Sequence, residues 1–425
     1  MDKVKRIYFV GIKGVAMAAL AIWAKEVGKI VAGSDVAEEF PTDEELNKAG
    51  IDVHEGFDQE HLVVFNPDLV IYTGAHGGRD NPQVGYAKER DILSLSHGQA
   101  LGLAMQGKRQ ISVAGSHGKT TTSAMIATIL MEAGLDPSYT IGCGSIRGLG
   151  RAGHAGKGDW FVAEADEYVT DPGHDPTPRF LWQHPEVLVV TNIDFDHPDV
   201  YPDLLSVQQA FIALQKQSTF TFISADDEAS SVLRNTDNVE TFAISEILKK
   251  VKLQVPGRHN MLNAQVAIAA CERIGIAWES IKRGLERFGG TKRRFEKLGE
   301  ARGALIYDDY AHHPKEIEAT IAAFRDMYPK KRLIVIFQPH TYSRTKALLT
   351  DFIRALGRAD IVLVTEIYAS ARETQREKGL AKQLGGLYRP TKKDVTEWLT
   401  KELNDGDVVV FMGAGDIYQW AKEIL

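Results

Sequence analysis

The sequence has few of the features that mark secreted, membrane and nucleic-acid-binding proteins. Of its 425 residues only Cys143 and Cys271 are cysteines, and no CxxC pair occurs. This excludes a disulfide framework and the common zinc spacing, and it is typical of a reduced compartment. No uncharged apolar run of about 20 residues is present, so we expect no membrane span. The net charge of −7 offers no general basic surface for nucleic acid or anionic lipid. A small anionic ligand needs only a local positive pocket and is not excluded.

The N-terminus has basic residues before an apolar stretch, a pattern that superficially matches a signal peptide. Glycines and Lys13 interrupt the stretch, and Lys25 and Glu26 close it. We therefore expect a strand, a loop and a helix here, and a cytoplasmic protein.

Short apolar runs alternate with helical patterns along the whole chain, which predicts βαβ units with parallel sheets. The polar segment 105–110 and the basic run 292–294 divide the chain into three such units, 1–105, 106–291 and 292–425. The predicted fold is α/β with a Rossmann-like N-terminal domain, a central P-loop-type domain with a mostly parallel sheet, and a Rossmann-like C-terminal domain.

A glycine-rich loop between a predicted strand and a predicted helix carries the strongest signal. It includes Gly115, Ser116, His117, Gly118, Lys119, Thr120 and Thr121. A helix N-terminus presents free N–H groups and partial positive charge, so it binds phosphate. Lys119 can reach the outer phosphates, and the Thr120 hydroxyl can bind Mg²⁺. Val113 stands where the full Walker pattern has a glycine, so the loop is a shortened version.

Two acidic clusters follow at the predicted ends of strands 160–162 and 187–190. They are Glu164–Glu167 and Thr191–His197. Ligands of open parallel sheets bind beyond the carboxyl ends of strands, and Mg²⁺ prefers carboxylate and phosphate oxygens. We expect Glu164 to be a metal ligand, as the first acid after its strand. For His197, a metal site and a purely structural role both remain open from the residues alone.

The N-terminal unit has a second glycine turn, with Gly11 and Gly14 after its first predicted strand. Asp35 ends the next strand, near the place where Rossmann units bind a ribose. A dinucleotide, a nucleotide-sugar and a structural turn all fit this pattern. Three further groups are also candidates: Asn260 with Asn263, Arg293 with Arg294, and Asp308–Pro314. Their simpler interpretations are, in the same order, helix capping, a solvated basic turn and a polar loop.

Together these segments resemble the Mur ligases over essentially the whole chain. The matching segments are GSHGKTTT at 115–122, EADE at 164–167, TNIDFDH at 191–197, PGRHNMLN at 256–263, KRRFE at 292–296, DDYAHHP at 308–314, FQPHTYSRT at 337–345 and MGAGDI at 412–417. Within the family, the resemblance is to the enzymes that join L-alanine to UDP-N-acetylmuramate in peptidoglycan precursor synthesis. It implies a UDP-sugar domain, an ATP domain and a closing amino-acid domain, with ATP and Mg²⁺ as cofactors.

The resemblance also implies roles for individual residues. Lys119, His197, Arg294 and Asp309 would be catalytic, and Thr120, Glu164 and His197 would bind metal. Asn260 and Asn263 would flank the adenine, with Arg294 and Asp309 reaching ATP. Gly11, Gly14 and Asp35 would face the UDP-sugar, and the amino-acid pocket would contain Tyr310, His312 and Arg344.

Three departures from the alanine-adding pattern bear on the amine substrate. Lys13 replaces a glycine, Glu167-Tyr168-Val169 replaces the usual continuation of the acidic motif, and Thr341 replaces an arginine. EADEY and the alanine of DDYAHHP resemble the related ligase that attaches a whole tripeptide to UDP-N-acetylmuramate. A non-catalytic UDP-sugar and ATP sensor is the alternative from another class, and a dehydrogenase would leave GKTTT unexplained. A monomer or a homodimer is expected, without nucleic-acid or membrane partners.

Overall fold

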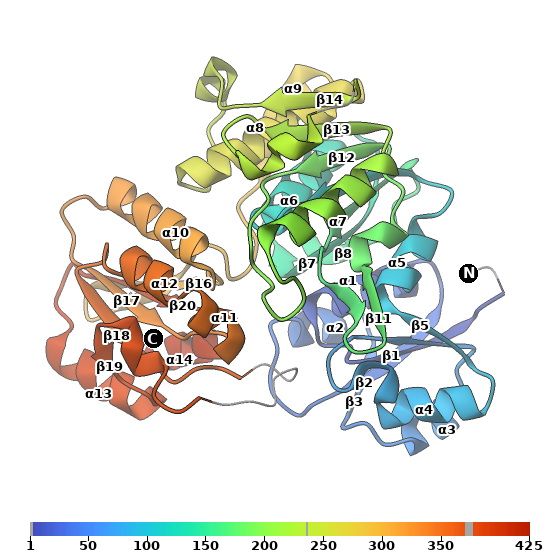
Figure 1. Cartoon of the computed structure of the whole chain (residues 1–425), viewed down its shortest axis with the longest axis horizontal. Coiled ribbons are helices and arrows are strands. Elements are labelled where there is room, and N and C mark those ends of the chain that lie inside the picture. The colour runs from blue at the N-terminus through green and yellow to red at the C-terminus, as the bar shows by residue number, and fades with distance from the viewer. Residues whose placement is uncertain (1–2, 235–236, 370–376) are drawn as a thin grey trace. The chain divides into compact units, whose positions relative to one another are not determined.

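The computed structural model describes residues 3–234, 237–369 and 377–425, and it contains three large, mainly parallel sheets (Figure 1). The α/β prediction with three sheets is therefore confirmed. The chain forms two compact units. The first comprises 1–195, 200–254 and 262–292 and holds the first two sheets; the second comprises 196–199, 255–261 and 293–425 and holds the third.

The N-terminal sheet is a five-stranded parallel sheet in the order β3-β2-β1-β4-β5. One face packs on α1 and α5, and the other on α3 and α4. Pro82 begins α4 and Asn81 caps it, while Ser96 and Gln99 form a capping box on α5. The strands are β1 (Arg6–Val10), β2 (Ile30–Asp35), β3 (Asp52–Glu55), β4 (Leu69–Tyr72) and β5 (Leu93–Ser96), and the helices are α1 (Val15–Glu26), α2 (Asp43–Lys48), α3 (Glu60–Phe65), α4 (Pro82–Glu89) and α5 (His97–Met105).

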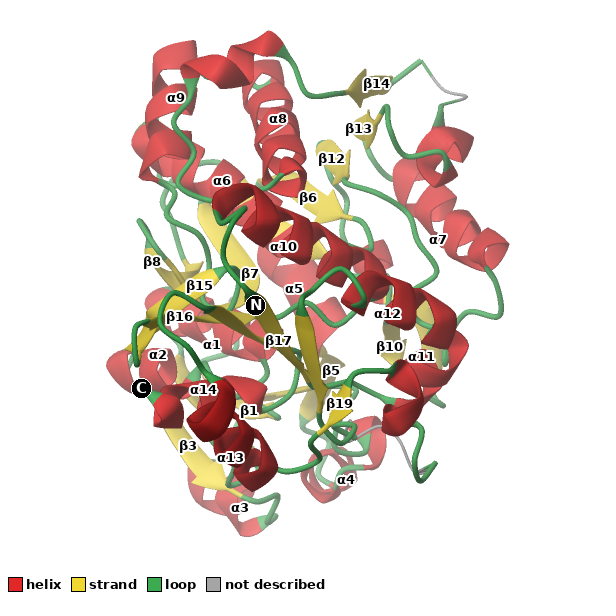
Figure 2. Ribbon diagram, turned by 90° about the vertical axis from the view of Figure 1, so that its left-hand side faces the viewer, coloured by secondary structure: helices red, strands yellow, loops and turns green. Residues whose placement is uncertain are grey.

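Among the described residues, the central sheet has seven strands in the order β14-β13-β12-β6-β9-β7-β8, with β8 antiparallel to its neighbour and the other pairs parallel. Helix α7 packs on one face, and α6 and α9 lie side by side (Figure 2), with Gly284 of α9 against Ile129 of α6. Its strands are β6 (Arg109–Ala114), β7 (Ser138–Ile146), β8 (Gly150–His154), β9 (Trp160–Ala165), β12 (Val187–Val190), β13 (Phe220–Ser224) and β14 (Val239–Phe242); the helices are α6 (Lys119–Glu132), α7 (Leu204–Lys216), α8 (Arg258–Arg273) and α9 (Trp278–Arg287).

A short hairpin of β10 (Val169–Asp171) and β11 (Asp175–Pro178) leaves the central sheet and meets the N-terminal domain. The Asp171 carboxylate accepts a hydrogen bond from the Arg79 N–H at 3.1 Å. Trp182, in the turn after the hairpin, packs so closely on α5 that a Cβ at Gly102 would lie 2.3 Å from its carbonyl oxygen. The hairpin therefore joins the first two domains within one compact unit.

The third sheet has the order β15-β16-β20-β17-β18-β19; β15 is antiparallel to its neighbour, and the other described pairs are parallel. Helices α10 and α12 cover one face, and α13 and α14 cover the other (Figure 1). The strands are β15 (Glu296–Ala301), β16 (Ala304–Asp309), β17 (Leu333–Phe337), β18 (Ile361–Val364), β19 (Leu387–Tyr388) and β20 (Val408–Met412), and the helices are α10 (Pro314–Met327), α11 (Tyr342–Ala347), α12 (Leu349–Leu356), α13 (Lys392–Glu402) and α14 (Ile417–Ile424). No described helix is long and apolar enough to cross a bilayer.

A charged cluster also links the first two domains. His154 of β8 lies 2.8 Å from Glu26 of α1 and 3.1 Å from Asp136, one carboxylate at each ring nitrogen. Both nitrogens therefore donate, as only the imidazolium can. The hydrogen bond to Glu26 is the main cause that raises the pKa of His154. Burial alone would raise the pKa of Glu26, but His154 and the Ala155 N–H lower it, and the Lys157 N–H and His154 lower that of Asp136.

We expect this cluster to make the free energy of unfolding depend on pH. The histidine contribution is present below about pH 6.5, its unfolded pKa, and is lost as the pH rises through the raised folded pKa. The carboxylate contributions are present above about pH 4.5 and are lost on acidification. Urea unfolding between pH 6 and pH 9 should therefore show His154→Gln losing less stability than the wild type, by at most about 1 kcal/mol because the groups are partly exposed. Parallel curves for the two proteins would contradict the assignment.

Candidate functional site

The predicted phosphate loop connects β6 to the start of α6. Gly115 and Gly118 have φ of 129° and 85°, in the region that favours glycine. A Cβ at Gly115 would lie 2.1 Å from the Thr191 hydroxyl, and one at Gly118 would lie 2.6 Å from the Asn263 side-chain oxygen. Both glycines are therefore required, and they leave the first N–H groups of α6 facing the loop.

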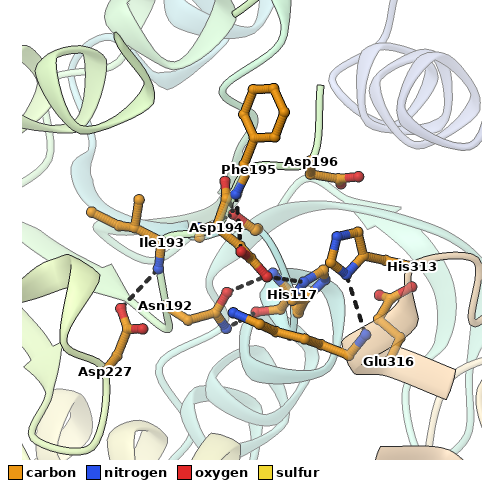
Figure 3. Close-up of polar contacts among 12 residues, drawn as sticks. His117, Asn192, Ile193, Asp194, Phe195, Asp196, Asp227, His313 and Glu316 are labelled. Atoms are coloured by element: carbon orange, nitrogen blue, oxygen red, sulfur yellow. Dashed lines mark hydrogen bonds and ion pairs between the residues drawn. The ribbon is translucent and has the colours of Figure 1, made fainter. Parts of the chain in front are cut away.

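The segment after β12 holds this loop in place (Figure 3). Asn192 accepts a hydrogen bond from the His117 N–H at 3.0 Å and donates to the His117 carbonyl at 2.9 Å. The Asp194 N–H donates to the Ser116 hydroxyl at 2.8 Å, and the Asp194 carboxylate lies 3.4 Å from the His117 ring. Asp227 in turn accepts from the Ile193 N–H at 2.9 Å. The residues Asn192 and Asp194 therefore fix the shape of the phosphate loop. The sequence had indicated the segment 191–197 as an acidic cluster, but not this structural role.

Lys119 begins α6 and points back across the loop. Its ammonium donates to the Gly115 carbonyl at 2.6 Å and to the Glu167 carboxylate at 2.9 Å. Burial would lower the pKa of Lys119, but the nearby carboxylates, Glu167 first among them, raise it above its usual range. Lys119 is therefore charged at the mouth of the loop. Its contact with Glu167 was not foreseen from the sequence.

Thr120 and Glu164 meet beside Lys119. The Thr120 hydroxyl donates to Glu164 at 3.1 Å, and the Gly142 N–H donates to the other carboxylate oxygen at 2.6 Å. Glu164 lies inside β9 rather than just after it, which corrects the predicted strand end at residue 162. Burial raises the pKa of Glu164, against the opposing effects of the Gly142 N–H and Lys119. A partly buried carboxylate beside a hydroxyl and a phosphate loop fits a Mg²⁺ ligand set.

The second glycine turn lies at the point where strand order reverses, between β1 and β4. Gly11 has φ of 81°, and a Cβ there would lie 2.4 Å from the Thr73 methyl group. Asp35, the last residue of β2, accepts from the Lys13 N–H at 2.7 Å and lies 3.5 Å from the His76 ring. Gly14 has an ordinary φ of −55°, so its backbone does not require glycine.

Burial raises the pKa of Asp35, although the Val36 and Lys13 N–H groups oppose this. The structure thus brings Gly11, Lys13 and Asp35 together and adds His76. The Lys13 ammonium, at the position that departs from the family pattern, donates to the carbonyls of Val36 and Glu38 at 3.0 and 2.9 Å. Lys13 therefore fixes the loop that follows β2.

The predicted residues of the second unit are mostly held by neighbours within it. Asp309 accepts from the N–H groups of Phe295 and Ala311 at 2.7 and 2.9 Å, so it holds the chain at both points. Arg294 pairs with Glu316 at 3.2 Å and lies over the Tyr310 ring. Burial raises the pKa of Asp309, with Arg294 opposing it.

The predicted amino-acid residues lie nearby in the second unit. His312 has its ring 3.0 Å from the Tyr310 carbonyl, and burial lowers the pKa of His312 to about 4, so its ring is neutral. Arg344 pairs with Asp196 at 2.8 Å, and His197 belongs to the same short segment, 196–199. Thr341 has φ of 68°, an unusual value for a β-branched residue, at the position that departs from the family pattern.

Helix α8 crosses the boundary between the two units. It starts at Arg258. Asn260, in the second unit, donates to the Pro256 carbonyl at 2.7 Å. Asn263, in the first, lies against Gly118 of the phosphate loop. The Asn260 amide therefore bonds to a carbonyl of the segment before α8 and does not cap a helix N–H in this contact, while Asn263 lies beside the phosphate loop.

Comparison with known proteins finds matches to one family, the Mur ligases, along nearly the whole chain. Three family models match: "Mur ligase family, catalytic domain" at 6–109, "Mur ligase middle domain" at 113–247 and "Mur ligase, glutamate ligase domain" at 293–415. The UDP-N-acetylmuramate–L-alanine ligase of Desulfitobacterium hafniense is 38% identical over 99% of both chains.

Among solved structures, a UDP-N-acetylmuramate–alanine ligase from Thermotoga maritima is similar with a TM-score of 0.81, at 28% identity over 99% of this chain and 98% of that one. A murein peptide ligase from Psychrobacter arcticus, 24% identical over 99% and 98% of the two chains, shares the fold with a TM-score of 0.75. Because three models of this family match successive parts of the chain and the relatives match from end to end, the chain belongs to the Mur ligase family.

Proposed function

We propose that this protein is an ATP-dependent ligase that joins L-alanine to the lactyl carboxylate of UDP-N-acetylmuramate. The observation that carries the proposal is the group formed by Lys119, Thr120 and Glu164 at a helix N-terminus. A protein that only sensed nucleotides would need the loop but not a partly buried carboxylate beside the threonine hydroxyl. The match to alanine-adding relatives over the full length supports L-alanine as the amine.

The proposed reaction has two steps. The substrate carboxylate attacks the γ-phosphorus of ATP, ADP leaves, and an acyl phosphate forms. The amine of L-alanine then attacks the acyl carbon, inorganic phosphate leaves, and an amide bond and a released proton result. Phosphoryl transfer depends mainly on positioning and on neutralising charge. Lys119 supplies a fixed positive charge for the γ-phosphate, and the N–H groups of the loop hold the other phosphates.

Thr120 and Glu164 would hold Mg²⁺, with His197 proposed for a second metal site. Bound Mg²⁺ would supply charge neutralisation between ATP and the substrate carboxylate. Arg294 and Asp309 are proposed to reach ATP, and Asn260 and Asn263 to flank its adenine. Gly11, Gly14 and Asp35 are proposed for the UDP-sugar, and Tyr310, His312 and Arg344 for the amino acid.

We propose one domain for each of the three substrates. Residues 1–105 would bind the UDP-sugar, 106–291 would bind ATP, and 292–425 would bring the amino acid. We place the enzyme in the cytoplasm, because ATP and UDP-sugars are made and used there.

Phosphate release from ATP, measured with Mg²⁺ and UDP-N-acetylmuramate while candidate amines are added in turn, tests the function. We expect release that depends on L-alanine. Release only with a tripeptide would instead assign the protein to tripeptide recycling, which EADEY at 164–168 also resembles. Tight binding of both nucleotides without turnover with any amine would identify a sensor.

A further inference from the structure

Arg179 is a cation inside the first unit that none of the roles above uses. It begins the short turn Arg179–Trp182 after the β10–β11 hairpin, and its side chain is 14% exposed. Its Nη1 pairs with Asp166 at 3.1 Å, and its Nε donates to the Val169 carbonyl at 3.1 Å. Asp166 lies two residues from Glu164, so Arg179 is tied to the acidic loop of the ATP site.

Two glycines of the N-terminal domain leave room for this arginine. A Cβ at Gly74, in the loop after β4, would lie 3.3 Å from Nη2 of Arg179. A Cβ at Gly98, in the first turn of α5, would lie 3.4 Å from both Cα and Cβ of Arg179. Arg179 therefore reaches the carboxyl edge of the N-terminal sheet, beyond β4 and β5, where open parallel sheets bind ligands.

The loop that Arg179 meets is part of the proposed sugar-nucleotide site. Thr73 of this loop packs on Gly11, and His76 pairs with Asp35. On its other side, Arg179 contacts the acidic segment that follows Glu164. It is thus in contact both with the loop that would hold the UDP-sugar and with the segment that would hold the metal. A substrate whose UDP-sugar part is bound at the first of these sites must place its carboxylate at the second.

A second polar group lies close to Arg179. Nε2 of His97 is buried and has no hydrogen-bond partner among the described residues. Burial, followed by the charge of Arg179, lowers the pKa of His97 to about 4, so this ring adds a neutral polar edge and no second charge. Of these two groups, only the guanidinium, paired with Asp166, offers a positive charge to an incoming carboxylate.

We propose that Arg179 binds the lactyl carboxylate of the sugar nucleotide and positions it toward the γ-phosphate. The assignment rests on the proposed function. A planar guanidinium can bind a carboxylate through two parallel N–H groups, which fixes orientation as well as distance. The bond to Asp166 sets the orientation of the fork, and Gly74 and Gly98 allow its approach. Arg179 thereby distinguishes a sugar nucleotide that carries the acid from one that lacks it.

The test compares two ligands that differ in this carboxylate. Binding of UDP-N-acetylmuramate and of UDP-N-acetylglucosamine, which lacks the lactyl group, is measured by calorimetry on the full chain. We expect Arg179→Gln to weaken binding of the first roughly 10- to 100-fold, the size of a lost hydrogen bond to a charged group. Binding of the second should stay within about threefold. Arg179→Lys should recover part of the loss, since it keeps the charge but not the fork.

Arg109→Gln is the matched control. Arg109 belongs to the same unit, lies at the start of β6 and also pairs with a carboxylate, that of Glu186. An equal loss for both ligands in Arg179→Gln would show that Arg179 only fixes the hairpin against the loop, and it would overturn the proposal. Unchanged binding of UDP-N-acetylmuramate would overturn it as well. A wild-type protein that binds neither ligand would overturn the proposed function itself, and this assignment with it.

Discussion

Lys119→Ala should abolish phosphate release from ATP while binding of UDP-N-acetylmuramate persists. The Lys119 ammonium lies at the mouth of the phosphate loop, 2.6 Å from the Gly115 carbonyl and 2.9 Å from Glu167. Loss of one fixed donor aimed at developing charge costs on the order of 10²- to 10³-fold in kcat. We expect a loss at the upper end, because Lys119 carries a full charge on a side chain that is only 15% exposed. Steady-state phosphate release and calorimetry with the sugar nucleotide measure the two quantities.

Lys25→Ala is the control, since Lys25 lies near the end of α1 and donates to the Gly50 carbonyl in an exposed position. It should match the wild type in both measurements. If Lys119→Ala also lost sugar-nucleotide binding, the picture of two separate nucleotide sites would be wrong. If it kept its turnover, Lys119 would have no role in phosphoryl transfer.

The phosphate loop was predictable because its signal is local. A strand, two glycines, a lysine and a helix follow one another within a few residues, and each has its own physical reason to be there. The same holds for Gly11, whose left-handed backbone is set within its own turn. Parallel-sheet topology then predicted that Glu164 would lie on the edge that carries Lys119, and the structure places them together.

The partners of these residues were not predictable, since they come from distant segments. Glu167 meets Lys119, Asn192 holds His117, and Arg179 reaches Gly74 only because the sheets bring their loops together. Strand β9 was predicted too short because Glu164 reads as polar although its backbone continues the ladder. Hydrophobic patterning does not show that a strand can continue through a partly buried carboxylate.

The partners of the two adjacent arginines in the KRRFE segment could not be predicted from the sequence either. Sequence resemblance selected Arg294, while the structure gives the larger structural role to Arg293. Arg293 is 4% exposed and donates to Asp308 at 3.0 Å and to the carbonyls of Gly413 and Gly415 at 2.7 and 3.0 Å. Its guanidinium also lies over the Tyr418 ring. It thus joins the chain before β15 to the segment after β20.

Arg293→Met should therefore destabilise the C-terminal domain by about 3–5 kcal/mol, the usual cost of removing one partner of a buried ion pair. Burial raises the pKa of Asp308 to about 6 even though Arg293 opposes it. Without Arg293 this pKa should rise further, because only the burial effect remains. The loss of stability should then be smaller at pH 5, where Asp308 takes up a proton, than at pH 8. Urea unfolding of the two proteins at both pH values measures the difference.

Arg294→Met is the matched control. It removes the same guanidinium from the neighbouring residue, whose side chain is 29% exposed. It should lower turnover, as a residue proposed to reach ATP, and cost at most about 1 kcal/mol of stability. Arg293→Met with Asp308→Leu should recover stability relative to Arg293→Met alone, since no charge is then left buried. If instead the two single variants lost equal stability, or if the loss in Arg293→Met did not change with pH, the buried pair would not be what joins these segments. The double variant separates the cost of the unpaired carboxylate from the loss of the bonds to Gly413 and Gly415, which neither single variant can do.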